Sequence, residues 1–426
     1  MIPCLQGADA ARWLDRLFSK DWAAVSSGDG VEKTVRDIIG QVREQGDAAL
    51  RNLAVRFGET PPASFKLLDS DVQAACDRVS DHTKQLLQRA AQRIRTFAAG
   101  VMQLVQPFTW DEAAIQTGMH WAPAQRVACY VPGGRFPLPS TALMTAVTAQ
   151  VAGVPDISLI CPAPCDEVIY AGTLAGVNRF YRMGGAQAVA AACFGTESVT
   201  PVDMLVGPGN AYVTEAKKQL MGIMGIDMLA GPSEVAILAD EGVNPDWAAL
   251  DLLAQAEHDP DARAVVLTPS ISVANAIHQS LMAMIQAHPA LPAYLKEKDD
   301  WGAILVLESE EACIQAINHL APEHVELLVQ NPHALKPKLQ HYGTLFMGYH
   351  TPVPYGDYVA GPNHTLPTAR TARFSGGLNP LTFLRPQSWV HATSQAQVIA
   401  QDSRSMAEIE GLIAHAASAA VREEVK

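Results

Sequence analysis

The segment Leu253–Pro260 contains two side chains whose types and spacing could bind a metal ion. Gln255 and His258 lie three positions apart, so on a helix they would share one face, one turn from each other. An imidazole nitrogen and an amide oxygen suit a divalent ion of the zinc type, although glutamine is an unusual ligand. Two ligands do not complete a metal site, and a histidine that contacts the last carbonyls of its helix is the commoner reason for such a pattern.

A carboxylate and an imidazole are adjacent farther along the chain. Glu323 and His324 follow Pro322, outside any regular helical pattern. Such a pair can divide the roles of general base and general acid near neutral pH. On these residues alone, a surface glutamate beside a partly buried histidine is the commoner arrangement. The pair is therefore a hypothesis that needs partners elsewhere in the chain.

Two more segments place an acid near a histidine. Asp357 and His364 fall in an irregular stretch rich in glycine, proline and threonine, whereas Glu410 and His415 lie five positions apart on the helix expected at the C-terminus. A solvated loop or helix face is the alternative for each pair. Their joint occurrence is informative, because one mixed nitrogen and oxygen metal site could be formed by Gln255, His258, Asp357 and His415.

The elements that must position these residues alternate between strand and helix from about residue 126 onward. Short apolar runs such as 127–131 and 157–161 are followed by turns and helical patterns, and a second series begins with 235–238 and 264–267. This alternation predicts right-handed parallel α/β sheets that bind ligands at the carboxyl ends of their strands, where the glycine-rich turns fall. No GxGxxG motif is present, so the ordinary dinucleotide fingerprint is missing.

The other helical segments are expected to act as scaffold or support. Asn244 and Pro245 have the types expected for the cap and the first residue of the helix that carries Gln255. The first quarter of the chain shows amphipathic helices and no catalytic signature. A single helix is expected from Ser405 to the C-terminus.

Composition narrows the functional classes. The 426 residues are 48% hydrophobic and 18% charged, and 31 basic against 44 acidic residues give a net charge of -13. This balance argues against general binding to nucleic acid or to an anionic membrane, and no apolar run reaches the roughly 18 residues that span a bilayer. Asp9 and Arg12 interrupt any secretory pattern at the N-terminus. Seven cysteines without a CxxC pair indicate reduced thiols and a cytoplasmic location.

A set of motifs, taken in order, resembles the histidinol dehydrogenase family from about residue 30 to the C-terminus. Together these motifs are highly specific for that family. They are Tyr130–Gly134, Gly184–Gln187, Gly207–Lys217, Ala230–Glu234, Gln255–Asp261, Ala321–His324 and Gly356–His364.

The resemblance implies a zinc-dependent, NAD-linked enzyme that oxidises L-histidinol to L-histidine through the aldehyde, the last step of histidine biosynthesis. Glu323 and His324 would be the acid–base residues. One zinc ion per subunit would be bound by Gln255, His258, Asp357 and His415. NAD would contact Tyr130, Gln187 and Asn210. The substrate would be held by Ser233, His324, His364, Glu410 and the zinc ligands.

The resemblance also implies an architecture. The fold class would be α/β, with two Rossmann-like parallel-sheet domains that lack GxGxxG and with small helical segments at both ends. Residues 1–24 would form the N-terminal helical segment, 25–128 with 234–377 the first domain, and 129–233 the second domain on the NAD side. The family is an intertwined homodimer, in which residues 378–426 would complete the partner's site. Glu410 and His415 would then act in trans.

An alternative substrate is a sulfonated diol. The segments 201–205 and 364–368 are similar to paralogous zinc and NAD enzymes that oxidise compounds such as dihydroxypropanesulfonate. A sulfonate pocket should contain a cation, and Arg135, Arg370 and Arg373 lie near the motifs in sequence. Histidinol is the favoured substrate because the other motifs match the histidinol enzymes.

Two further alternatives come from other classes. An enzyme-derived scaffold without turnover would not need the intact Glu323 and His324 pair. An aldehyde dehydrogenase with a cysteine nucleophile would need an activated thiol, and Cys129 and Cys193 lie in apolar runs where nothing nearby would lower a thiol pKa.

Overall fold

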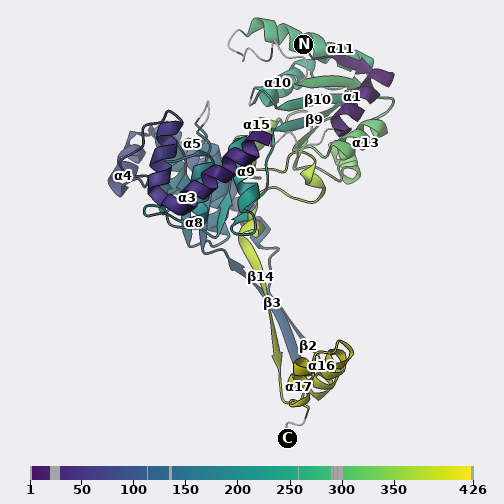
Figure 1. The fold of residues 1–426 in the computed structure, drawn as a ribbon. Helices are drawn as coiled ribbons and strands as arrows, with labels where there is room; N and C mark the ends of the chain where they lie inside the picture. Colours follow the sequence, from purple (N-terminus) through teal and green to yellow (C-terminus); the bar gives the residue numbers. More distant parts are fainter. Residues whose placement is uncertain are drawn as a thin grey trace.

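The computed structural model describes residues 2–19, 29–112, 114–133, 137–257, 259–288, 291, 295 and 301–423. Within these residues the chain forms two α/β lobes and a small helical lobe, which a long β-ribbon carries away from the other two (Figure 1). The sheet of each α/β lobe is parallel throughout the described strands. The predicted α/β class with two Rossmann-like sheets is confirmed.

The first lobe contains a sheet with the strand order β6-β5-β4-β7-β8, called here the first sheet. Helices cover both of its faces, so β4 and β5 are almost fully buried. The order reverses at β4, which pairs with β5 on one side and β7 on the other. The strands are β4 (Arg126–Tyr130), β5 (Asp156–Ile160), β6 (Arg179–Tyr181), β7 (Met204–Val206) and β8 (Gly225–Ile226). The connecting helices are α6 (Pro139–Val151), α7 (Asp166–Leu174), α8 (Gly185–Phe194) and α9 (Ala211–Leu220).

The N-terminal helices pack on the first lobe. α3 (Asp29–Arg56) lies against α8 and α9, and α5 (Asp81–Met102) lies against α6, with α4 (Asp69–Arg78) beside α7. This differs from the sequence-based division, which joins residues 25–128 to 234–377. The apolar face of α3 decides the grouping, because Val35 and Val42 are buried in the same core as Val189 of α8.

The second lobe contains a sheet with the order β1-β11-β10-β9-β12-β13, the second sheet. One face packs on α10 and α11, and the other on α1 and α13. The N-terminal segment is thus integrated into this lobe, since its strand β1 extends the sheet. The strands are β1 (Cys4–Gln6), β9 (Glu234–Ala239), β10 (Arg263–Thr268), β11 (Gly302–Val306), β12 (His324–Leu328) and β13 (Thr344–Met347). The helices are α1 (Gly7–Ser19), α10 (Pro245–Ala256), α11 (Ile271–Ala287), α13 (Glu310–Leu320), α14 (Pro332–Leu335) and α15 (Val353–Tyr358).

The β-ribbon is formed by β2 (Phe108–Glu112), β3 (Ile115–Pro123) and β14 (Leu384–Ala392), which pair antiparallel. Sequence analysis missed it, because β2 and most of β14 are exposed and carry no alternating apolar pattern.

The expectation of one C-terminal helix was wrong. The distal lobe consists of α16 (Gln397–Ile409) and α17 (Ile413–Ala420). Gly411, with φ of +73°, separates them, since a left-handed glycine commonly ends a helix. No helix in the described residues is both long and apolar enough to cross a membrane.

Candidate active site

A cavity of about 200 Å³ lies between the two α/β lobes. The first lobe contributes residues at the carboxyl edge of its sheet, where the turn after β7 supplies Pro208. The second lobe contributes its opposite edge, because Ser233 precedes β9 and His324 begins β12. The cavity therefore lies at the carboxyl ends of strands in the first sheet but at the amino ends of strands in the second sheet. The lining also includes Ser140, Thr141, Gly231, Gln255, Glu323, Asp357, Tyr358 and His364.

Glu323 is buried beside the start of β12, with 6% of its surface exposed. Its Oε2 accepts hydrogen bonds from the Ser233 hydroxyl and, at 3.0 Å, from the backbone N–H of Glu234. Both donors lie about ninety residues earlier in the chain. The common arrangement of a surface glutamate does not apply here, because a neighbouring parallel strand supplies the partners of this carboxyl group.

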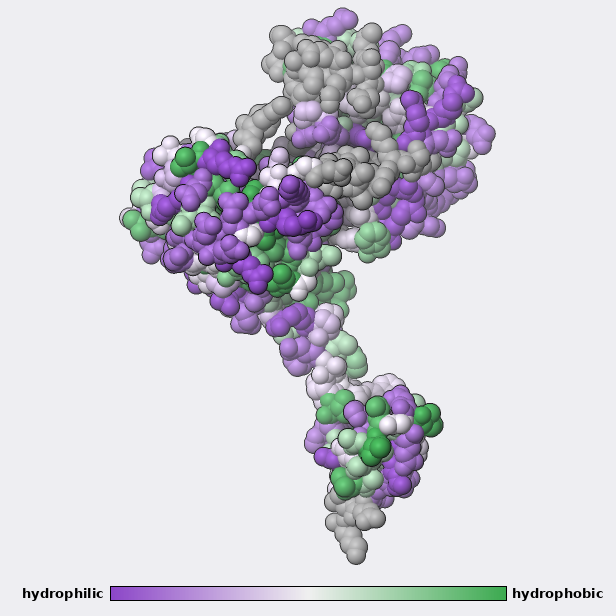
Figure 2. Space-filling model, in the orientation of Figure 1, coloured by the Kyte–Doolittle hydropathy of each residue, from purple (hydrophilic) through white to green (hydrophobic). Residues whose placement is uncertain are grey.

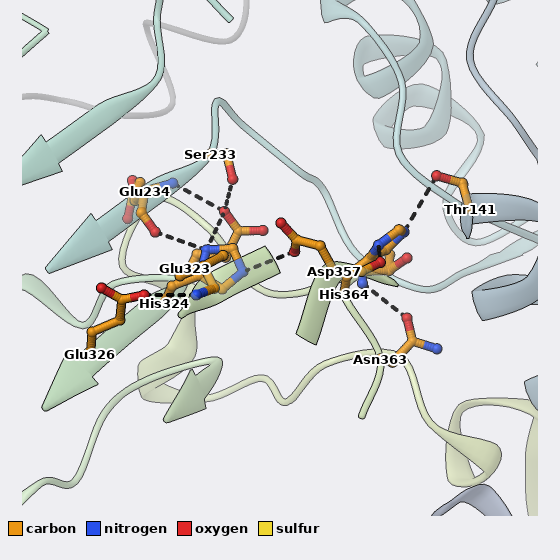
Figure 3. Close-up of polar contacts among 11 residues, drawn as sticks. Thr141, Ser233, Glu234, Glu323, His324, Glu326, Asp357, Asn363 and His364 are labelled. Atoms are coloured by element: carbon orange, nitrogen blue, oxygen red, sulfur yellow. Dashed lines mark hydrogen bonds and ion pairs between the residues drawn. The ribbon is translucent and has the colours of Figure 1, made fainter. Parts of the chain in front are cut away.

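His324 completes the acid–base pair and is 3% exposed. Its Nδ1 lies 3.2 Å from the carbonyl of Glu234 and 3.7 Å from Glu323 Oε2. A carbonyl can only accept, so Nδ1 carries the hydrogen of that contact and Nε2 is the atom that can take up a proton. Nε2 lies 3.9 Å from Asp357 Oδ1, and Figure 3 shows these side chains converging with Ser233.

Burial shifts the acidity of the carboxyl groups around this pair. It raises the pKa of Glu323 well above its usual range; the charges of Glu234 and Asp357 add to the effect, and the bonds from Ser233 and the Glu234 amide oppose it. Burial likewise raises the pKa of Glu234 and of Asp357 to about 7. No lysine or arginine is found among the described residues that line the cavity. Ionisation of one of these carboxyl groups therefore makes ionisation of the others less favourable, and a bound cation would offset this repulsion.

The candidate metal ligands are only partly brought together. Gln255, near the C-terminal end of α10, and Asp357 on α15 line the same cavity. Asn244 caps α10 as predicted, since its side chain accepts from the backbone N–H of Asp246 at 2.9 Å. His258 lies outside the described residues. In the described chain no group of at least three histidine, cysteine or acidic side chains forms a metal site.

Glu410 and His415 lie on the distal lobe, away from the cavity. Both are exposed: Glu410 directly follows α16, and His415 faces a separate surface hollow with Ala392 and Ser418. They do not share one last helix, because Glu410 lies just after α16 and His415 lies in α17. Within a single chain, these two predicted site residues do not join the others (Figure 1).

The predicted NAD contacts gather at the carboxyl edge of the first sheet. Tyr130 ends β4, and its hydroxyl accepts the N–H of Gly185 at 3.0 Å; burial raises its pKa to about 12. Gln187 lies in the first turn of α8 and is 8% exposed. Asn210 caps α9 by accepting from the N–H groups of Tyr212 and Val213.

Sequence analysis missed two residues that shape the cavity. Thr141, in the first turn of α6, is not among the predicted site residues, but its Oγ1 lies 3.3 Å from His364 Nε2. The Nδ1 of His364 in turn donates to the carbonyl of Asp357 at 2.8 Å. Glu234 holds both members of the acid–base pair through its backbone. The sequence signal that could have identified Glu234 was its position at the end of the motif Ala230–Glu234.

Two alternatives lose their support at this site. Burial raises the pKa of the Cys129 thiol to about 12 and raises that of Cys193, which is the opposite of an activated nucleophile. Arg370 lines a different cavity, beside Trp13, and Arg373 donates to the carbonyl of His319. Arg135 lies outside the described residues. No cation expected for a sulfonate thus reaches the described lining.

The fold and the cavity define a two-lobed α/β enzyme with a buried acid–base pair. A family model described as histidinol dehydrogenase matches residues 23–423. The chain belongs to the histidinol dehydrogenase family. It is 44% identical over 401 residues to histidinol dehydrogenase 1 of a Nostoc species, covering 92% of each chain. It is 40% identical to the histidinol dehydrogenase of Hydrogenovibrio crunogenus, covering 94% of each.

The solved structures agree with this assignment. A crystal structure of histidinol dehydrogenase from Elizabethkingia anophelis matches 99% of this chain and 98% of its own, with a TM-score of 0.91 and 30% identity. The relatives found give no support to the sulfonated-diol alternative. The chain is therefore an oxidoreductase of the dehydrogenase class.

Proposed function

We propose that the protein oxidises L-histidinol to L-histidine through the aldehyde, with zinc bound in the cavity and two NAD+ consumed in succession. Membership of the family supports the reaction. The observation that carries the proposal is the buried pair of Glu323 and His324, which shares one cavity with Gln255 and Asp357. At the carboxyl edge of the first sheet, the turn after β7 supplies Pro208 to the same cavity.

His324 handles the proton of the alcohol step. Its Nδ1 is held by the Glu234 carbonyl, so Nε2 takes the hydroxyl proton of the substrate as a hydride leaves the same carbon. Bound NAD+ would accept that hydride, and zinc would orient the imidazole and amine of the substrate. The fixed ring orientation matters because the proton must leave in the direction of Nε2.

Glu323 handles the aldehyde step. Its Oε2 is fixed by Ser233 and the Glu234 amide, and its carboxylate activates the water that attacks the aldehyde carbon. The raised pKa makes this carboxylate a stronger base than an exposed glutamate. The hydrate would then give up the second hydride to a second NAD+. Closure of the cavity between the lobes would retain the aldehyde while the cofactor exchanges.

The donors in the cavity fit a zinc ion. Asp357 is a buried carboxylate whose pKa rises through burial alone, and a divalent cation would offset that cost. Gln255 supplies a second oxygen donor at 3% exposure. With His258 and His415 the set would be mixed nitrogen and oxygen, one zinc per subunit.

His415 and Glu410 would reach the cavity of a partner subunit. Their lobe stands at the end of the β-ribbon, and Figure 2 shows hydrophobic side chains exposed on it. Ile409 and Ile413 are 80% and 85% exposed, which is costly for an isolated lobe. Mixing an inactive His324→Ala chain with an inactive His415→Ala chain should restore activity in the mixed dimers. Failure of refolded mixtures to regain activity would count against action in trans.

Substrate oxidation is tested by stoichiometry. Zinc-loaded protein should form two NADH per L-histidinol and leave dihydroxypropanesulfonate unchanged. One NADH per histidinol, or turnover of the sulfonate alone, would overturn the proposal. We also place the enzyme in the cytoplasm, which agrees with the free thiols of all seven cysteines.

A further inference from the structure

A buried ion pair lies beneath the glycine-rich turn that follows β7. Lys217 on α9 and Asp227, just after β8, form an ion pair in which the side chains are 2% and 0% exposed. Lys217 Nζ also donates to the carbonyl of Gly207 at 2.9 Å, and the N–H of Gly207 donates to Asp227 Oδ2 at 2.7 Å. The two charged groups therefore bind the N–H and the carbonyl group of the same residue.

Gly207 needs such a restraint. Its φ of +116° is open to glycine and strained for other residues, and a Cβ at this position would meet the carbonyl oxygen of Tyr130 at 2.2 Å. Glycine also has the largest conformational freedom to lose when a turn becomes ordered. The turn therefore requires a residue without a side chain and, for the same reason, outside contacts that fix its conformation.

The stability of the fold is a weak reason for keeping such a pair. Replacing a buried ion pair with neutral side chains of similar volume is often neutral or stabilising, because removing two charges from water is costly. The pair is also neutral as a unit, and its contacts are directed at the backbone of Gly207 and, from Asp227 Oδ1, at the N–H of Met228. It is therefore suited to fixing a turn rather than to attracting a phosphate.

We propose that Lys217 and Asp227 are positioning residues, which set the turn from Gly207 to Asn210 in the conformation that receives NAD. The inference rests on the proposed function. The chain returns to this turn twice, once through α9 and once through the end of β8, so the pair joins segments that would otherwise move independently. Asn210 at the end of the turn then caps α9, the helix that carries Lys217.

The test compares NAD binding with folding in the zinc-loaded full chain. Lys217→Met combined with Asp227→Asn removes both charges without leaving one of them alone. Its melting temperature should stay near that of the wild type, whereas NAD affinity measured by calorimetry without substrate should fall by about tenfold, the loss expected for one charged hydrogen bond. The KM for NAD should rise in parallel, while the KM for histidinol and the kcat at saturating NAD stay unchanged.

A matched control uses the ion pair of Arg179 and Asp156, which lie at the amino ends of β6 and β5 in the same sheet. Arg179→Met with Asp156→Asn should leave NAD binding intact. If the Lys217 and Asp227 double variant does not fold, Lys217→Arg serves instead, because the wide guanidinium keeps the charge and displaces the turn. A folded variant that binds NAD as tightly as the wild type, or a control that weakens NAD equally, overturns the positioning role. Wild-type protein that binds no NAD overturns both this inference and the proposed function.

Discussion

The two parallel sheets contribute to one cavity in opposite ways. The first sheet presents the carboxyl ends of β4 and β7, where Tyr130 ends β4, Asn210 caps α9 and the turn after β7 supplies Pro208 to the cavity. The second sheet presents the start of β12, where burial raises the pKa of Glu323 well above its usual range. The first edge carries the residues proposed to contact NAD, and the second carries the groups suited to proton transfer. Under the proposed function, the two similar sheets divide cofactor binding and chemistry between them.

The largest effect should come from the second sheet. His324→Ala removes the ring proposed to take the hydroxyl proton, so kcat for the alcohol step should fall by about 10²- to 10⁴-fold while NAD affinity stays unchanged. Steady-state NADH formation and calorimetry measure the two quantities. His333→Ala, at an exposed position on α14, is the matched control and should keep full activity. Equal losses in both variants would contradict the assigned role.

Glu323→Gln should separate the two oxidations. The amide keeps an acceptor for Ser233 but cannot activate water, so the aldehyde step should slow by about 10²-fold or more and the alcohol step by less. Trapping of the aldehyde in a single-turnover experiment detects the difference. Equal slowing of both steps, without any trapped aldehyde, would show that the division of labour is incorrect. Glu241→Gln on an exposed turn is the control.

Asp357→Asn tests the metal on the same edge. Loss of the buried charge should weaken zinc binding by at least about tenfold, because even changes to groups behind a metal ligand have effects of that size. Metal analysis after dialysis should show zinc and activity falling together. If the inactive variant retained zinc, Asp357 would contact the substrate rather than the metal.

Tyr130→Phe should have a smaller effect, confined to the first sheet. The change removes the hydroxyl that accepts from Gly185, so the KM for NAD should rise by a few-fold to about tenfold and the KM for histidinol should not. Steady-state titration of each substrate separates the outcomes. A rise in both constants would mean that the two edges are not independent.

The smallest expected effect concerns the free energy of unfolding and two carboxyl groups of the second lobe. Burial raises the pKa of Asp251 and of Glu326, which lie close together, so the folded state holds a proton that the unfolded chain releases above about pH 4. The free energy of unfolding should therefore fall as pH rises from about 4 through the raised pKa. Asp251→Asn should flatten this fall by on the order of 1 kcal/mol in urea titrations. If the free energy of unfolding changed with pH equally in the wild type and in Asp251→Asn, the two carboxyl groups would not hold this proton.

Much of the scaffold follows from the sequence alone. Periods of apolar residues predict the parallel strands, and Asn244 with Pro245 predicts where α10 begins, because caps and periodicity are local properties of the chain. The motifs that resemble the family also contain Glu323, His324 and Asp357, which the fold brings to one cavity. These features required no knowledge of distant contacts.

Tertiary structure decided the rest. Ser233 and Glu323 are far apart in the chain, and only the pairing of β9 with β12 buries the carboxylate and raises its pKa. The β-ribbon carries His415 and Glu410 away from the cavity of their own chain. Local sequence patterns specify periodicity and caps, but burial and charge at a site depend on which elements pack against it. Those contacts exist only in the folded protein.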